Sequence, residues 1–96
     1  MKNRKYRIAR RYAEVGKYLQ VLRKKAGLTQ RDVSLELGYS SAQHISNVEA
    51  GIMLPPLKKM KAMQQMYGGS VETLIEIILE CERRAIAAEL GRKDKK

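Results

Sequence analysis

Residues 22–51 read LRKKAGLTQRDVSLELGYSSAQHISNVEAG, and this stretch decides the fold. Glycines at positions 27, 38 and 51 divide it into two short segments, because glycine commonly follows the last turn of a helix. Thr29 precedes the first segment, with Asp32 three residues further on, which is the spacing of a capping box. The second segment is expected over about 42–50. Two short helices joined by a glycine turn are typical of a helix-turn-helix.

The flanking sequence predicts three more helices. Apolar residues recur at spacings of four and three up to Ala26, which indicates a first helix beginning near Tyr6 or Arg11. Gly16 interrupts this pattern at a cost of about 1 kcal/mol relative to alanine. Pro55-Pro56 marks the start of a fourth helix, and Ser70 caps a fifth that reaches about Leu90. No segment alternates with period two, so the fold is expected to be all-α with five helices.

The length of 96 residues suits one domain. We expect a basic N-terminal extension over 1–11, a core over 12–74, a C-terminal helix over 70–90 and a basic tail over 91–96. Cys81 is the single cysteine, so no internal disulfide forms, which fits a reducing compartment. We expect neither a secretory signal nor a membrane span. The expected location is therefore the cytoplasm, in association with the nucleoid.

The charge is strongly basic and unevenly distributed. The net charge is +10, and residues 1–31 hold eleven basic side chains against one acid, Glu14. The segment 32–57 has no Lys or Arg, and five Glu residues follow within 72–90. A basic face indicates a polyanionic partner such as a phosphate backbone, although a solvated surface gives the same pattern. Charge alone does not decide between the two.

The sequence from Leu22 to Leu74 resembles the lambda-repressor-like (Cro/CI, XRE-type) helix-turn-helix family. The matching residues are the run Leu22–Gln30, then Val33, Leu37-Gly38, Ile45, Val48-Glu49-Ala50-Gly51, Pro55, Leu57, Met60, Met63 and Ser70-Val71-Glu72. The resemblance implies a five-helix fold whose third helix lies in the major groove of double-stranded DNA. It also implies a bacterial or phage transcriptional regulator, with repression as the expected mode.

The third helix has one apolar and one polar side. Ile45 and Val48 share the inner side, and the outer side presents amides that can form paired hydrogen bonds with an adenine edge. The expected base contacts are Gln43, Asn47, Ser46 and Ala42. Because this helix has no Lys or Arg, phosphate contacts must come from elsewhere. The expected phosphate contacts are Gln30 (implied by the resemblance), Arg31, Ser41, Lys58, Lys59, Arg10 and Arg11.

Two features depart from the family pattern. Seven steps separate Gly38 from Ile45, where the family usually has six, so the turn holds one extra residue. The loop after Gly51 reads Ile52-Met53-Leu54, where the family commonly has basic residues. These apolar residues either pack under the domain or form a surface for a protein partner.

The remaining expectations concern structure and assembly. The resemblance implies an ion pair between Arg23 and Glu49 inside the fold. Cys81 is interpreted as an interface or surface thiol. The fifth helix has more apolar surface than one small domain needs, which indicates either a homodimer interface or a cover for the first helix. The expected dimer interface is centred on Ile77, Cys81, Ala85 and Ala88.

The sequence favours a DNA-binding regulator over an enzyme. It has no phosphate-binding glycine loop, no paired catalytic carboxylates and no nucleophile motif, so we expect no enzymatic activity, no cofactor and no metal. The leading hypothesis is sequence-specific binding of double-stranded DNA as a dimer. The alternatives are a protein-interaction adaptor on the same fold, or the antitoxin of a toxin–antitoxin pair.

Overall fold

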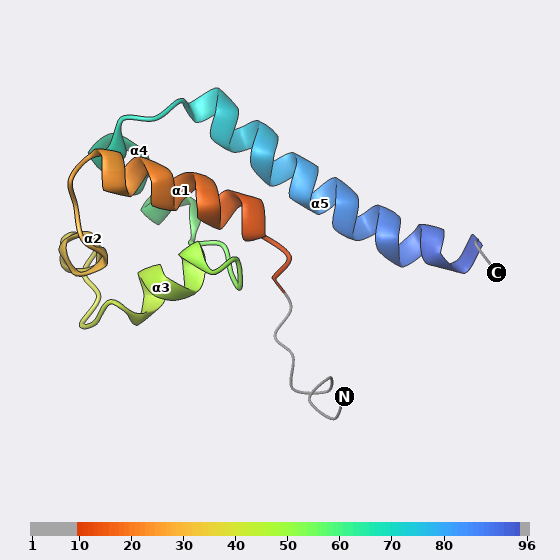
Figure 1. The fold of residues 1–96 in the computed structure, drawn as a ribbon, viewed down its shortest axis with the longest axis horizontal. Coiled ribbons are helices and arrows are strands. Elements are labelled where there is room, and N and C mark those ends of the chain that lie inside the picture. The colour runs from red at the N-terminus through yellow and green to blue at the C-terminus, as the bar shows by residue number, and fades with distance from the viewer. Residues whose placement is uncertain (1–9, 95–96) are drawn as a thin grey trace.

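The structure, a computed structural model, describes residues 10–94, which form five α-helices and no strand (Figure 1). The expected five-helix, all-α fold is confirmed. The helices are α1 (Ala13–Lys25), α2 (Gln30–Glu36), α3 (Gln43–Glu49), α4 (Leu57–Tyr67) and α5 (Val71–Asp94).

The helix boundaries follow from local chemistry. The Thr29 hydroxyl accepts a hydrogen bond from the backbone N–H of Asp32 at 3.0 Å, and the Asp32 carboxylate accepts from the N–H of Thr29 at 2.9 Å. This reciprocal capping box satisfies two backbone donors at the start of α2. The bond from the Thr29 N–H also lowers the pKa of Asp32. At the start of α5, the Ser70 hydroxyl accepts from the N–H of Thr73.

The first helix begins at Ala13, two residues after Arg11, which is the later of the two starts that the sequence indicated, because Arg11 and Tyr12 lie in a turn. The earlier start, near Tyr6, lies outside the described residues. The N–H of Tyr12 donates to the carbonyl oxygen of Gly51 at 3.0 Å, which ties this turn to the segment after α3. Residues 1–9 of the expected basic extension, which covers 1–11, lie outside the described residues.

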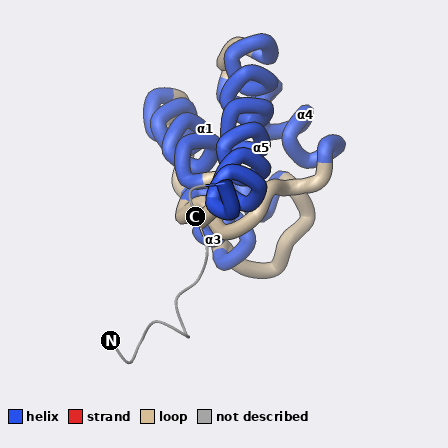
Figure 2. Tube along the Cα trace, turned by 90° about the vertical axis from the view of Figure 1, so that its right-hand side faces the viewer, coloured by secondary structure: helices blue, strands red, loops and turns tan. Residues whose placement is uncertain are grey.

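The helix α1 is the centre of the fold. It packs against α3, α4 and α5 (Figure 2), while α2 packs mainly on α3. Leu19 and Val15 on α1, Val33 on α2 and Ile45 on α3 are all at most 1 % exposed. Methionines and Tyr67 from α4 and apolar residues from α5 complete the core. The helices α2 and α3 are therefore held on the central helix α1 through a shared core.

Gly16 allows α1 and α3 to approach closely. A Cβ atom at this position would lie 2.5 Å from the carbonyl oxygens of both Val48 and Glu49, which is too close for any side chain. Gly51 has φ +84° and makes a similarly close approach to Ala13. Gly16 therefore has a packing role, beyond the helix interruption inferred from the sequence.

The helix α5 runs along the outside of the fold and past the N-terminal end of α1 (Figure 1). It has 24 residues, which corresponds to roughly 36 Å at 1.5 Å per residue. Among the residues that the structure describes, no helix is both long enough and apolar enough to cross a bilayer.

Candidate nucleic-acid interface

The outer side of α3 presents two amide side chains that are bonded to each other. Ile45 and Val48 are at most 2 % exposed on the inner side, whereas Gln43 is exposed and Asn47 is half-buried. Gln43 Nε2 donates to Asn47 Oδ1 at 2.9 Å. This bond leaves Gln43 Oε1 as an acceptor and Asn47 Nδ2 as a donor. An acceptor beside a donor is the pattern that matches the N6 and N7 atoms of adenine.

An aromatic stack crosses the turn between α2 and α3, which contains the extra residue. The rings of Tyr39 and His44 lie parallel, with centroids 4.1 Å apart. Lys59 Nζ lies 5.1 Å from the centroid of the Tyr39 ring and donates to the carbonyl oxygen of Leu37 at 2.6 Å. The turn is thus fastened both to α3 and to α4. Neither Tyr39 nor His44 was assigned a role from the sequence. The two residues lie five positions apart across an irregular turn, which no periodicity argument connects.

Glu49 at the end of α3 joins three helices. Arg23 on α1 donates to it from Nε at 2.6 Å and from Nη2 at 3.0 Å, and the side chains of Arg23 and Glu49 are 8 % and 2 % exposed. The structure thus contains the expected ion pair. These bonds raise the pKa of Arg23. Gln20 donates to the same carboxylate at 3.4 Å and Gln30 on α2 at 2.9 Å.

Gln30 therefore has a partner inside the protein. The resemblance assigns this residue to a DNA phosphate, but its amide nitrogen is directed at Glu49. Its position at the start of α2 is the expected one, and it links α2 to α3. The amide nitrogen carries a second hydrogen, so a phosphate contact from Gln30 stays a prediction.

Two basic residues lie at opposite ends of α3. Arg10 Nη1 donates to the carbonyl oxygen of Ala50 at 3.1 Å, next to the C-terminal end of the helix. Lys59 is held near the N-terminal end through Leu37. Arg31 and Lys58 are exposed, as is Ser41, whose hydroxyl accepts from the N–H of Gln43 at 3.3 Å. Ser46 and Ala42 are half-buried beside the amide pair.

Arg11 differs from the other expected phosphate contacts. Its Nη2 atom lies 2.6 Å from Glu82 Oε1, so the side chain is directed toward α5 rather than α3. The Tyr12 hydroxyl donates to the second Glu82 oxygen at 2.7 Å. The bond from Tyr12, with a smaller contribution from Arg11, lowers the pKa of Glu82. These groups join the start of α1 to the middle of α5.

Cys81 lies in the core, which corrects its assignment to an interface or the surface. The residue is 4 % exposed and clusters with the buried side chains of the fold. Ile77 and Ala85 lie on the same side of α5, where they are half-buried, and Ala88 is exposed. The face centred on Cys81 is therefore the one that covers α1, the alternative that the sequence left open.

The apolar loop after α3 packs inward. Ile52, Met53 and Leu54 are all half-buried, and the last two contact the hydrophobic core. This arrangement favours the packing interpretation of the loop over a partner surface. Within residues 10–94, no group of three or more His, Cys, Asp or Glu side chains is placed to hold a metal ion.

Comparison with known proteins identifies the chain's family. The helix-turn-helix family model matches residues 19–74, which is more than half of the chain and spans the end of α1 through the start of α5. Searches of the curated proteins and of the solved structures gave no match. The chain therefore belongs to the lambda-repressor-like (XRE-type) helix-turn-helix family, a family of DNA-binding regulators.

Proposed function

We propose that the protein binds double-stranded DNA sequence-specifically and acts as a dimeric transcriptional repressor on the nucleoid. The observation that supports this most directly is the bonded pair of Gln43 and Asn47 on the outer side of α3. Their mutual hydrogen bond fixes both amides before DNA arrives, so less side-chain freedom is lost on binding. An uncharged recognition face discriminates between bases, because it adds no general attraction to phosphates.

Phosphate contacts come from residues around α3. Arg31 and Lys58 are exposed without a protein partner among the described residues, so they are available to phosphates. Arg10 lies at the C-terminal end of α3 and can reach the DNA backbone there. Lys59 and Ser41 serve as further phosphate contacts, whereas Ser46 and Ala42 remain proposed base contacts beside the amide pair. Arg11 takes no part in this proposal, because Glu82 holds it against α5.

Repression follows from occupancy of a promoter. A dimer is proposed because one helix-turn-helix reads few base pairs, whereas two copies place recognition helices about 34 Å apart on one face of DNA. Binding of such a dimer across a promoter excludes RNA polymerase. Transcription from a reporter that bears the preferred DNA sequence of the protein should therefore fall when the protein is added.

Selection from a random duplex pool, followed by titration of single variants, tests the proposal. Gln43→Ala and Asn47→Ala should each weaken binding to the selected sequence by roughly 1–3 kcal/mol and leave binding to random DNA nearly unchanged. Arg31→Ala and Lys58→Ala should weaken both and reduce the salt dependence of binding. Selection that enriches no sequence, or equal losses on all DNA from the amide variants, would contradict the proposed recognition face.

A further inference from the structure

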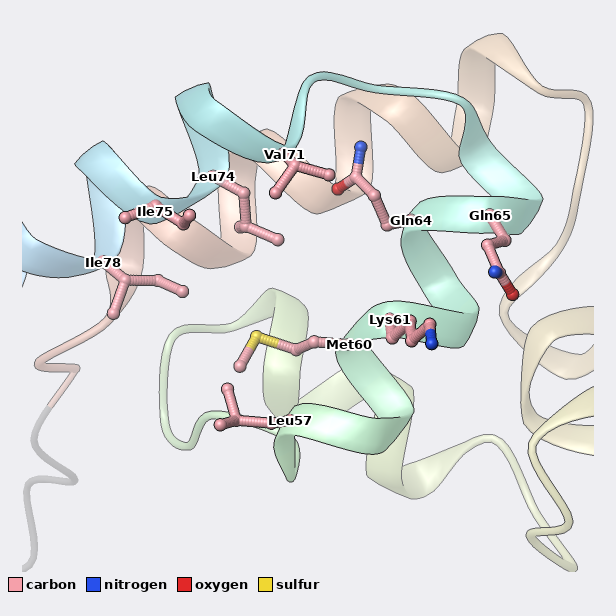
Figure 3. Close-up of a pocket in the computed structure, with 9 residues that line it drawn as sticks. All are labelled: Leu57, Met60, Lys61, Gln64, Gln65, Val71, Leu74, Ile75 and Ile78. Carbon is pink, nitrogen blue, oxygen red and sulfur yellow. The ribbon is translucent and has the colours of Figure 1, made fainter.

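The helices α4 and α5 face each other across an open groove. The groove is lined from α4 by positions 57, 60, 61 and 64 and from α5 by positions 71, 74, 75 and 78, which have the same helical spacing of three and four. Figure 3 shows Leu57 and Met60 on α4 facing Leu74 and Ile78 on α5. The groove has a volume of about 370 Å³ and is lined mostly by aliphatic and methionine side chains. Its size and polarity are those of a site for a small apolar ligand.

The groove extends from the surface to the hydrophobic core. Met60 and Leu74 are 5 % and 6 % exposed and belong to the core, whereas Leu57 and Val71 at the edges are 79 % and 55 % exposed. An aliphatic chain in the groove would remove these edge residues from water. Such burial is favourable in proportion to the apolar area that it covers.

A buried acceptor without a donor lies in the same lining. Gln64 is 8 % exposed, and its Nε2 atom donates to the carbonyl oxygen of Gly69, which fixes the orientation of the amide. Gln64 Oε1 has no hydrogen-bond donor within residues 10–94. Figure 3 shows this oxygen on the side facing Val71, across the groove, with the nitrogen pointing away. Because a buried acceptor without a donor costs free energy, a ligand that supplies the donor is favoured.

The charge of the lining selects the kind of donor. Among the described residues that line the groove, only Lys61 is charged, and it is exposed. An ammonium group would be repelled by Lys61, and a carboxylate has no hydrogen to donate to Gln64 Oε1. A helix from another protein uses its backbone N–H groups internally, so it offers no main-chain donor either. A neutral hydroxyl or amide N–H group meets both conditions.

The groove is distinguished by its chemistry rather than by its size. A larger hollow, of about 450 Å³, lies beside Ile86 and Leu90 near the other end of α5. Arg11 and Glu89 border that hollow, and none of the buried side-chain atoms that lack a partner within residues 10–94 belongs to its lining. The combination of an aliphatic lining and a buried acceptor therefore points to the α4–α5 groove.

We propose that the α4–α5 groove binds a small neutral aliphatic molecule whose hydroxyl or amide N–H group donates to Gln64 Oε1. The polar end of the ligand lies beside Gln64 and Val71, and its aliphatic chain extends toward Leu57 and Ile78. No lining residue belongs to α3, so the site is separate from the recognition face and the proposal does not rest on DNA binding.

Heptanol and its isomer methoxyhexane are matched probes, because they have the same size and only the alcohol can donate a hydrogen bond. Each is titrated into the full chain without DNA and followed by NMR. Backbone amides of residues 57–65 and 71–78 should shift, and heptanol should bind roughly 5- to 10-fold more tightly than the ether, because only heptanol satisfies Gln64 Oε1. Equal affinities, or no shift of these amides, would overturn the proposal. Binding that weakens as the protein concentration rises would assign the groove to a second copy and overturn it as well.

Three variants locate the bound probe. Gln64→Met removes the acceptor and keeps the length of the side chain, so it should abolish the preference for heptanol and leave the affinity for methoxyhexane nearly unchanged. Ile75→Asp introduces a charge into the lining and should weaken binding of both probes by about 10-fold or more. Ile86→Asp is the matched control, since it makes the same change on α5 beside the larger hollow and should bind both probes as the parent does.

Circular dichroism verifies that the three variants fold, and the comparison of the two probes on the parent protein needs no variant. A preference for heptanol that survives Gln64→Met would refute the contact with Gln64 Oε1. Equal losses from Ile75→Asp and Ile86→Asp would show that the probes do not bind in the groove. Because no DNA is present, these outcomes are independent of whether the protein recognises an operator.

Discussion

Replacement of Arg23 by alanine tests the ion pair that holds α3 against α1. Glu49 accepts four hydrogen bonds, and two of them, at 2.6 and 3.0 Å, come from Arg23. The Glu49 side chain is only 2 % exposed, so loss of the guanidinium leaves a buried carboxylate without its charged partner. Removal of one partner of a buried pair costs about 3–5 kcal/mol. The remaining amide donors, Gln20 and Gln30, soften the loss, so we expect a value near 3 kcal/mol.

This loss is large relative to the total unfolding free energy of the protein. A chain of 96 residues has an unfolding free energy of roughly 5–14 kcal/mol, so the variant should remain folded at low temperature with a clearly lower urea midpoint. Arg31→Ala removes an exposed arginine and is the matched control, with an expected change below about 0.5 kcal/mol. Urea denaturation followed by circular dichroism measures both.

A double-mutant cycle separates the pair from its surroundings. Arg23→Met combined with Glu49→Leu removes both charges and keeps most of the volume, so the double variant should be more stable than either single variant. The reasoning is refuted if Arg23→Ala costs less than about 1 kcal/mol, or if the two single effects simply add.

Three further changes test other parts of the fold. Gly16→Ala should destabilise the protein by roughly 1–3 kcal/mol, because the added Cβ would meet two carbonyl oxygens of α3. The control Gly91→Ala has open space around it and should stabilise the protein by up to about 1 kcal/mol, so equal effects in urea denaturation would argue against the close approach of α1 and α3. Ser34→Ala should leave the urea midpoint unchanged or slightly higher, because the buried Ser34 hydroxyl has no hydrogen-bond partner within residues 10–94, and a loss above about 1 kcal/mol would reveal one. Because the pKa of Glu82 is lowered, its bond with Tyr12 stabilises the fold above the ordinary pKa of 4.5, and this contribution is lost as the pH falls through the lowered pKa. Glu82→Gln should therefore reduce the drop in thermal stability below pH 4.5, and an unchanged pH profile would show that the bond does not contribute.

Short-range sequence signals made the helices and the outer side of α3 predictable. Glycines, the Thr29 capping box and the proline pair set boundaries that depend on a few adjacent residues. The outer side of α3 followed from helical periodicity, because Ile45 and Val48 fix which side is buried. The pairing of Arg23 with Glu49 was implied by the family resemblance, since the two residues are 26 positions apart.

The orientation of α5 could not be obtained in the same way. Ile77, Ile78 and Leu79 are consecutive, so apolar residues surround much of this helix and periodicity does not select one buried face. The position of α1 determines which face of α5 is buried, because α1 covers the side that includes Cys81. The partners of Arg11 and Gln30 were missed for a similar reason, because they come from segments that only the tertiary fold brings close.

The contacts of Glu49 also bear on how the protein opens. Since one carboxylate joins α1, α2 and α3, separation of any of these helices breaks a shared set of bonds. Backbone amides in the three helices should therefore exchange with solvent deuterium as one cooperative unit. The last turns of α5 up to Leu90 share none of these bonds and extend past α1, so their amides should exchange much earlier in an isolated chain. A body of three helices that opens as one unit thus carries a helix end whose exchange is independent of it.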